Sequence, residues 1–111
     1  MIYLASPYSH RDPIIRQRRF DLAVDYVSIV MLRPQAIYSP IVHCHPVALK
    51  HKLPKGWDFW KLHDLAILRH ADELQILCIP GWQDSVGVRN EINFAMSAGI
   101  RIAYIEPDIE S

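Results

Sequence analysis

The chain has 111 residues, half of them hydrophobic, which is enough to bury one core and fits a single domain over residues 1–111. Its 12 basic and 12 acidic side chains cancel to a net charge of zero, which argues against binding to a nucleic acid polymer or to an anionic membrane. No apolar run approaches the length of a membrane span and the first residues look like a strand rather than a signal peptide, so we expect a cytosolic protein with reduced cysteines.

The first half of the chain predicts two strands and one long helix. Residues 2–5 form a strand, and a helix follows with Asp12 as its N-cap and Pro13 in its first turn. The inner side of this helix is expected to carry Phe20, Ala23, Val24, Val27, Val30 and Met31. Residues 36–39 form a second strand. The proline- and histidine-rich residues 40–56 are expected to be irregular, with at most one helical turn at 47–49, and to lie where a substrate lid would lie.

The second half predicts two more helices and two more strands. Asp58 is expected to cap a helix whose inner side carries Trp60, Ile67, Leu68 and Ala71. Residues 74–79 and 101–105 form strands, and the helix between them ends at Gly99, with an inner side formed by Val88, Ile92, Ala95 and Ala98.

This alternation of strands and helices with short connections predicts an α/β fold. The expected architecture is a three-layer α/β/α sandwich around a small parallel sheet of the flavodoxin-like or Rossmann-like type. No Gly-x-Gly-x-x-Gly motif follows the first strand and no Walker-type loop is present, so we expect no dinucleotide site and no cofactor.

Residues 80–92 join the third strand to the last helix, and such turns at the carboxyl edge of a parallel sheet bind ligands. Glu91 lies on the flank of the apolar stripe, and Gly87 one turn earlier leaves room above its carboxylate. The unpaired N–H groups and the dipole of the helix start predict a lowered pKa for Glu91. Such a carboxylate suits a nucleophile or an oxocarbenium stabiliser, but a surface glutamate beside a glycine that only loosens the turn fits the spacing equally well.

Asp64 is a second acid within an apolar stripe, four residues after Trp60. Burial against a tryptophan predicts a raised pKa for Asp64. Two carboxyl groups whose pKa values move in opposite directions are typical of the acid and the nucleophile in glycoside chemistry. The alternative is a structural link in which Asp64 bonds Lys61 or a strand N–H.

Further polar side chains are expected at the same edge of the sheet. The loop after the first strand offers the hydroxyl, imidazole and guanidinium groups of Ser6, Tyr8, Ser9, His10 and Arg11. Arg11 could hold a phosphate, although a solvated arginine is commoner. Ser85 or Asp84 caps the last helix, whose N-terminus also suits a phosphate or a sugar hydroxyl. Trp82 could stack on a base, although tryptophan is more often part of the core.

The sequence His43-Cys44-His45, with His51 and His63 farther along the chain, raises the question of a zinc site. No second pair of ligands follows at a standard zinc spacing, and the segment contains few acids. We therefore expect no metal, and we interpret the histidines as pocket-lining or surface residues.

Three motifs give the chain a resemblance to a known group of proteins. They are residues 3–8 (YLASPY), the run from Trp60 through Asp64 to residues 71–72, and the central motif Pro80-Gly-Trp-x-Asp-Ser-x-Gly-x3-Glu91. They resemble the nucleoside 2-deoxyribosyltransferase-like superfamily, which includes 2′-deoxynucleoside 5′-phosphate N-hydrolases. Over nearly its full length, the chain is most similar to the small DUF1937 proteins within that group.

The resemblance implies roles for individual residues. Glu91 would be the nucleophile that attacks the anomeric carbon, Tyr3 would bond that glutamate, and Asp64 would assist the departing base or position the sugar. Ser85 stands where phosphate-preferring hydrolases carry serine and transferases carry aspartate, which implies a nucleoside 5′-monophosphate as substrate. The Gly-Gly-Arg phosphate segment of the hydrolases is absent, so candidates for substrate binding are Ser6, Tyr8, Ser9, Arg11, His43, Trp82, Ser85 and Gly87.

The resemblance also implies a homodimer or a higher homo-oligomer, because relatives complete the site with a residue from a neighbouring subunit. The leading hypothesis is an N-glycosidase that acts on a (deoxy)nucleoside 5′-monophosphate. The alternatives are a nucleoside deoxyribosyltransferase and a non-catalytic nucleotide-binding or sensor protein on the same scaffold.

Overall fold

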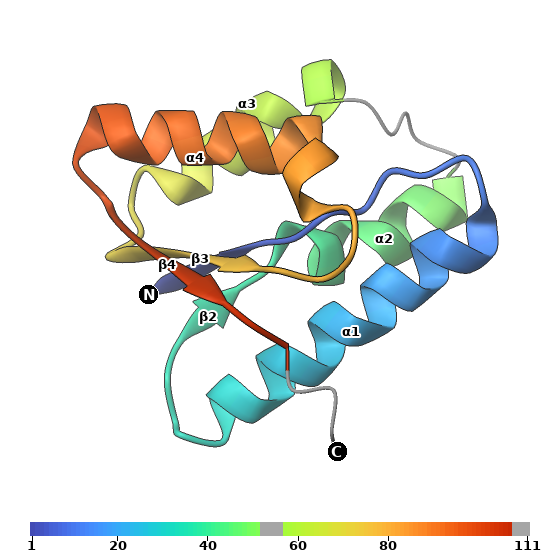
Figure 1. The fold of residues 1–111 in the computed structure, drawn as a ribbon, viewed down its shortest axis with the longest axis horizontal. Coiled ribbons are helices and arrows are strands. Elements are labelled where there is room, and N and C mark those ends of the chain that lie inside the picture. Colours follow the sequence, from blue (N-terminus) through green and yellow to red (C-terminus); the bar gives the residue numbers. More distant parts are fainter. Residues whose placement is uncertain (52–56, 108–111) are drawn as a thin grey trace.

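The computed structural model describes residues 1–51 and 57–107, which form an all-parallel sheet with helices on both faces (Figure 1). The four strands lie in the order β2-β1-β3-β4. The expected α/β sandwich with a parallel sheet is therefore confirmed. In chain order the elements are β1 (Ile2–Ala5), α1 (Pro13–Met31), β2 (Ile37–Tyr38), α2 (Pro40–His51), α3 (Trp57–Leu68), β3 (Glu73–Leu77), the 3-10 turn η1 (Trp82–Asp84), α4 (Val86–Ala98) and β4 (Arg101–Ile105).

Two separate cores cover the two faces of the sheet, because successive side chains of a strand point to opposite sides. Tyr3 of β1 packs in one core with Leu68 of α3 and Val88 of α4. The neighbouring Leu4 packs in the other core with Val27 of α1. Figure 1 accordingly shows α3 and α4 on one side of the sheet and α1 on the other.

The strand order places a ligand-binding crevice between β1 and β3. These two strands are paired in parallel, with Ala5 opposite Ile76, so the loops that follow them begin side by side. The chain leaves β1 toward α1 on one face and leaves β3 toward α4 on the other face. Connections that diverge in this way open a crevice at the carboxyl ends of the strands, where ligands bind in open α/β sheets.

Most helix ends agree with the sequence prediction. Asp12 caps α1 by accepting a hydrogen bond from the Ile14 N–H at 2.9 Å. Gly99 ends α4 with a left-handed φ of 72°, which glycine adopts without strain. Met31 and Ala98, expected on the inner sides of their helices, are exposed instead. Each is the last residue of its helix, where the apolar stripe has already left the sheet.

Residues 40–51 form the helix α2, so the expectation of an irregular segment is wrong there; residues 52–56 lie outside the described residues. Ser39 caps α2 by accepting a hydrogen bond from the Val42 N–H at 3.2 Å. Pro40 stands in the first turn, where its missing N–H costs nothing. Asp12 and Pro13 carry the same signature at the start of α1, so Ser39-Pro40 was a helix start signal that the expectation of an irregular segment overlooked.

Helix α2 persists although Pro46 lies inside it and removes one backbone hydrogen bond. Cys44 and Ala48 of this helix are buried, and Ile41 is half-buried. These three positions recur at intervals of three and four residues, which is the spacing of one helix face. Burial of that face compensates for the interior proline.

Smaller differences concern α3 and β3. The helix α3 begins at Trp57, so Asp58 lies within its first turn rather than at the cap. The Asp58 carboxylate is 3.8 Å from the Lys61 ammonium group. β3 covers residues 73–77 instead of 74–79, because the chain turns away from the sheet before Pro80.

In the described part of the chain, no helix is both long and apolar enough to cross a membrane.

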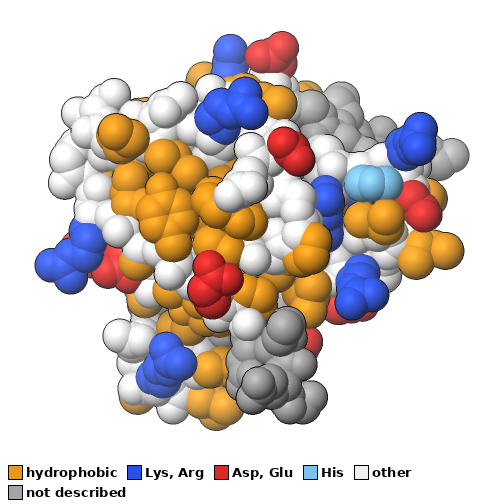
Figure 2. Space-filling model, viewed as in Figure 1, with side chains coloured by type: hydrophobic (Ala, Val, Ile, Leu, Met, Phe, Trp, Pro, Cys, Tyr) orange, Lys and Arg blue, Asp and Glu red, His pale blue; other side chains and the backbone are white. Residues whose placement is uncertain are grey.

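Figure 2 shows hydrophobic side chains gathered on the face where the edge strand β4 lies. On β4, Tyr104 is 54% exposed and packs against Trp82 with 5.6 Å between the ring centroids. This strand is therefore less covered than the central β1 and β3.

Candidate active site

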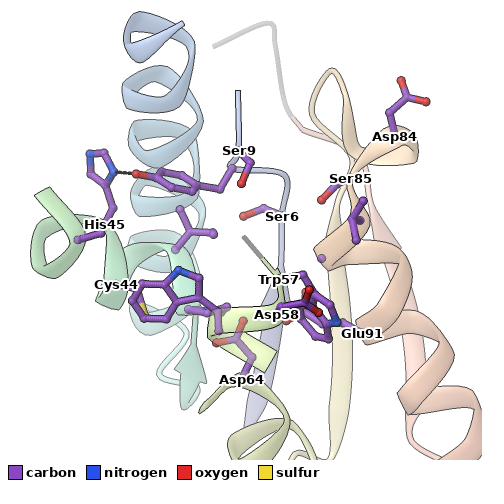
Figure 3. A pocket seen from close by; sticks show the side chains of 17 residues that line it. Ser6, Ser9, Cys44, His45, Trp57, Asp58, Asp64, Asp84, Ser85 and Glu91 are labelled. Atoms are coloured by element: carbon purple, nitrogen blue, oxygen red, sulfur yellow. Dashed lines mark hydrogen bonds between the residues drawn. The ribbon is translucent and has the colours of Figure 1, made fainter. Parts of the chain in front are cut away.

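A cavity of about 500 Å³ opens at the carboxyl ends of β1 and β3. Its walls come from the loop after β1, from α2, from α3 and from the start of α4 (Figure 3). Pockets of 300–1,000 Å³ are typical of small-molecule sites, so this cavity has room for a base and a sugar. It lies at the crevice that the strand order predicts.

Glu91 lines the cavity from α4 and is only 3% exposed. The hydroxyl of Tyr3, a fully buried residue of β1, donates a hydrogen bond to Glu91 Oε2. Burial, together with the negative charge of Glu91, raises the pKa of Tyr3, so this hydroxyl keeps its proton and remains a donor. The core of the sheet thus fixes the orientation of the glutamate.

The expectation of a lowered pKa for Glu91 is wrong. Burial raises the pKa of Glu91 to about 8, and the hydrogen bond from Tyr3 opposes this rise only in part. Glu91 lies in the second turn of α4, whereas the helix dipole acts mainly within the first turn. Loss of water around the carboxylate therefore outweighs both favourable interactions.

Asp64 of α3 lines the same cavity, and Figure 3 shows its side chain and that of Glu91 pointing into it from two different helices. Asp64 is 7% exposed, and its Oδ1 has no hydrogen-bond partner among the described residues. Burial raises the pKa of Asp64 to about 7, as expected. The alternative of a link to Lys61 is not observed, because Lys61 pairs with Asp58.

Three serine side chains add hydroxyl groups to the cavity wall: Ser6, Ser9 and Ser85. The Oγ of Ser6 is buried and has no hydrogen-bond partner within the described chain. The Oγ of Ser85 caps α4 by accepting a hydrogen bond from the Val88 N–H at 3.2 Å. That bond does not use the serine proton, so Ser85 can still donate to a ligand.

His45, interpreted from the sequence only as a pocket-lining or surface histidine and not as a substrate-binding candidate, lies in the cavity wall (Figure 3). It is hydrogen-bonded through Nδ1 to the hydroxyl of Tyr8. Its Nε2 is 3.1 Å from Gln17 Oε1, a carbonyl oxygen that can only accept. This arrangement assigns the imidazole proton to Nε2 and makes Nδ1 the acceptor for Tyr8. The spacing of His45 relative to Ile41 and Ala48 would have revealed this position if α2 had been recognised as a helix.

The structure brings Ser6, Tyr8, Ser9, Ser85 and Gly87 to the cavity, as expected. The other three candidates lie elsewhere. Arg11 and His43 are exposed, and Trp82 packs against Tyr104 beside β4 rather than lining the cavity.

The described part of the cavity lining is acidic. It contains the carboxyl groups of Asp58, Asp64, Asp84 and Glu91 and no lysine or arginine. Arg19, which lies close by, donates instead to the carbonyl oxygens of Ser9 and Pro80. Within the described lining, a ligand phosphate would thus meet hydroxyl, indole and imidazole groups but no side chain of lysine or arginine.

One cluster of described side chains could hold a metal ion. The ligand atoms of His43, Cys44 and His63 lie within 4.8 Å of one another. No metal site was expected, because no second pair of ligands follows His43-Cys44-His45 at a standard zinc spacing. Cys44 and Cys78 are both free thiols, as expected.

Comparison with known protein families matches residues 1–106 to the family described as a domain of unknown function, DUF1937. The chain belongs to the DUF1937 family. A search among curated proteins finds no match to it. The match to DUF1937 spans all the described residues that line the cavity, from Ser6 to Glu91, so this part of the site belongs to the domain that defines the family.

Proposed function

We propose that this DUF1937 protein cleaves the N-glycosidic bond of a nucleoside or a nucleoside 5′-monophosphate, with Glu91 as the nucleophile. The observation that carries the proposal is that two buried acids line one nucleoside-sized cavity: Glu91, held by Tyr3, and Asp64, with an unpartnered oxygen. The resemblance of the motifs around these residues to the nucleoside 2-deoxyribosyltransferase-like superfamily supports the same assignment.

In the proposed reaction, ionised Glu91 attacks C1′ of the sugar while the bond from C1′ to the base nitrogen breaks. The bonding electrons leave with the base, and a glycosyl ester forms on Glu91. Asp64 is placed to hydrogen-bond the departing base or a sugar hydroxyl through its unpartnered Oδ1. Water then attacks C1′ and breaks its bond to the Glu91 oxygen: the hydroxyl stays on the sugar, the proton goes to the departed base, and the carboxylate is regenerated. Tyr3 donates its hydrogen bond to that carboxylate.

Two observations bear on whether the substrate carries a phosphate. The hydroxyl groups of Ser6, Ser9 and Ser85 can donate to a phosphate, and the motif around Ser85 resembles that of phosphate-preferring hydrolases. The acidic side chains in the described lining favour an uncharged nucleoside instead, since like charges repel. The substrate panel in the test below therefore contains both classes.

Two related functions share the first steps. A deoxyribosyltransferase would form the same ester on Glu91 and let a second base take the place of water. A nucleotide sensor would bind the same ligand and leave its glycosidic bond intact.

The proposal also includes a cytosolic location, which agrees with the two free thiols, and a homo-oligomer, which the resemblance implies.

The test is to incubate the protein with a panel of nucleosides and their 5′-monophosphates and to measure the released base by liquid chromatography. We expect release by the wild type, a loss of about 10³-fold or more in Glu91→Gln, and a smaller loss in Asp64→Asn. Glu106→Gln, a change at an exposed acid after β4, serves as the matched control and should retain activity.

A labelled second base in the same assay distinguishes hydrolysis from transfer, because only a transferase yields a labelled nucleoside. Tight binding of a panel member by the wild type without base release would support the sensor. Release that persists in Glu91→Gln would show that Glu91 is not the nucleophile.

A further inference from the structure

Helices α2 and α3 bring three metal-binding side chains together beside the cavity. His43 and Cys44 come from α2 and His63 from α3, and their ligand atoms all lie within 4.8 Å of one another. The rings of His43 and His63 are nearly parallel, with 9° between their planes and 5.8 Å between their centroids. Nineteen positions separate Cys44 from His63 in the sequence, so only the fold creates this cluster.

The donor set matches the chemistry of zinc. Two imidazole nitrogens and one thiolate sulfur are ligands that zinc takes in tetrahedral sites. With bonds of about 2.0–2.3 Å, neighbouring ligand atoms around zinc lie about 3.3–3.6 Å apart. His43 and His63 are exposed, so their rings can rotate to close the remaining distance without disturbing the core.

Tyr38 of β2 supplies the support that metal-binding histidines commonly have. Its hydroxyl is 2.9 Å from Nε2 of His63, and this contact orients the ring beside Cys44. Its ring also lies beside that of His43, with 6.0 Å between the centroids. The partly buried Tyr38 thus contacts both histidines from the direction of the sheet.

We propose that His43, Cys44 and His63 bind a zinc ion that links α2 to α3, with water in the fourth position. Binding forms one Zn–S bond and two Zn–N bonds and releases the thiol proton of Cys44 to solvent. Because Cys44 also lines the cavity, the ion lies at its wall and fixes the two helices that form that side. This site is independent of the glycosidase proposal, since neither Glu91 nor the cleaved bond takes part in it.

The test uses the full chain without a histidine tag, freed of metal by a chelator and kept reduced. Titration with Co²⁺ should give one equivalent of binding, with tetrahedral visible bands and a thiolate-to-cobalt charge-transfer band in the near ultraviolet. Zn²⁺ should abolish both signals by displacing the cobalt. Zn²⁺ should also raise the melting temperature of the metal-free protein, because it binds the folded state.

Cys44→Ser should lose the charge-transfer band, and His43→Ala and His63→Ala should each weaken binding at least 10-fold. His70→Ala, an exposed histidine just after α3 and outside the cluster, is the matched control and should bind like the wild type. Circular dichroism verifies the fold of each variant. If Cys44→Ser does not fold, the two histidine variants decide the outcome, since both side chains are exposed.

A cobalt spectrum without the charge-transfer band would overturn the proposal. So would binding that is as tight in His43→Ala and His63→Ala as in the wild type.

Discussion

Glu91 shows how a buried position changes the chemistry of a carboxyl group. Burial raises its pKa from the ordinary value of 4.5 to about 8, although Tyr3 donates a hydrogen bond to it. At neutral pH most molecules without ligand therefore carry a protonated Glu91. The proposed nucleophile is the ionised form, so base release should increase with pH until about pH 8.

The same shift in the pKa of Glu91 predicts a pH-dependent effect on stability. Between about pH 4.5 and 8 the folded protein holds a proton on Glu91 that the unfolded chain has lost, so this group lowers the free energy of unfolding as the pH rises. Each unit of pKa difference corresponds to about 1.4 kcal/mol. We expect Glu91→Gln to be more stable than the wild type by at least about 1 kcal/mol at pH 8, with a smaller difference at pH 5.

Urea unfolding of both proteins across this pH range measures the difference. Glu106→Gln, which changes an exposed acid, should follow the wild type at every pH. A Glu91→Gln variant that is less stable than the wild type at pH 8 would contradict the prediction.

Tyr3→Phe tests the hydrogen bond from the core to the glutamate. The hydroxyl favours the ionised form of Glu91, so its removal should raise the pKa of Glu91 further. The pH profile of kcat/KM should then shift to higher pH, with activity partly recovered in alkaline buffer. A merely structural role of the hydroxyl would lower activity equally at every pH. Tyr104→Phe, at an exposed tyrosine of β4, controls for the change of residue type.

At the scale of single elements, Gly87 lies in the first turn of α4. Glycine lowers the stability of the helix there, but its missing side chain leaves space in the cavity. Its φ is not in the left-handed region, and among the described residues a methyl group at this position would meet only Trp57 Cε3 at 3.8 Å and Ser85 Oγ at 3.9 Å. Alanine therefore fits without a clash and favours the helix by up to about 1 kcal/mol. The added methyl group would lie in the cavity that Gly87 lines.

We accordingly expect Gly87→Ala to melt at a higher temperature than the wild type and to bind nucleosides at least several-fold more weakly. Calorimetric titration and thermal unfolding of the same samples measure the two effects. Ser97→Ala, near the exposed end of α4, should leave ligand binding unchanged. Unchanged affinity in Gly87→Ala would show that the glycine is not needed for ligand space.

The elements themselves differ in how well the sequence predicted them. The strand β1 and the helices α1 and α4 were predicted because each has a start or stop residue next to a regular apolar pattern, as at Asp12 and Gly99. The helix α2 was missed because the proline- and histidine-rich composition of residues 40–56 was interpreted as irregular structure, and the helix start at Ser39-Pro40 was overlooked. His45 was lost from the candidate site for the same reason.

At the scale of the whole molecule, Arg19 connects the two loops that flank the cavity. Its Nη1 donates to the Ser9 carbonyl oxygen at 2.8 Å and its Nη2 to the Pro80 carbonyl oxygen at 3.4 Å. The backbone of Gly81, with a φ of 95°, passes directly against this guanidinium group. One side chain from α1 thus links the segment after β1 to the segment after β3.

Arg19→Ala should loosen both loops and lower the free energy of unfolding by about 1 kcal/mol, since two hydrogen bonds to a charged but partly exposed group are lost. The affinity for ligand should fall several-fold, because Ser9 and Ser85 lie in or just beyond these loops. Chemical denaturation and ligand titration measure the two changes. Arg18→Ala, an exposed neighbour on α1, should behave like the wild type, and equal losses in both variants would contradict a specific role for Arg19.

Position along the chain predicted that the turn before Glu91 lies at the carboxyl edge of the sheet. Asp64 was singled out by its place in the apolar stripe of its helix, and the contact between Tyr3 and Glu91 was implied only by the resemblance to a known superfamily. The degree of burial was not accessible in the same way. The pKa of Glu91 depends on water excluded by several distant segments, and the proximity of His63 to Cys44 depends on how two helices face each other.

Tyr3 has its ring in the hydrophobic core and its hydroxyl on Glu91. A substitution that repacks the interior around this ring would therefore also alter how readily the glutamate ionises, even if it lies far from any ligand. Directed evolution of DUF1937 proteins should for this reason recover changes in pH optimum from mutations beneath the sheet surface, and not only from mutations at the mouth of the cavity.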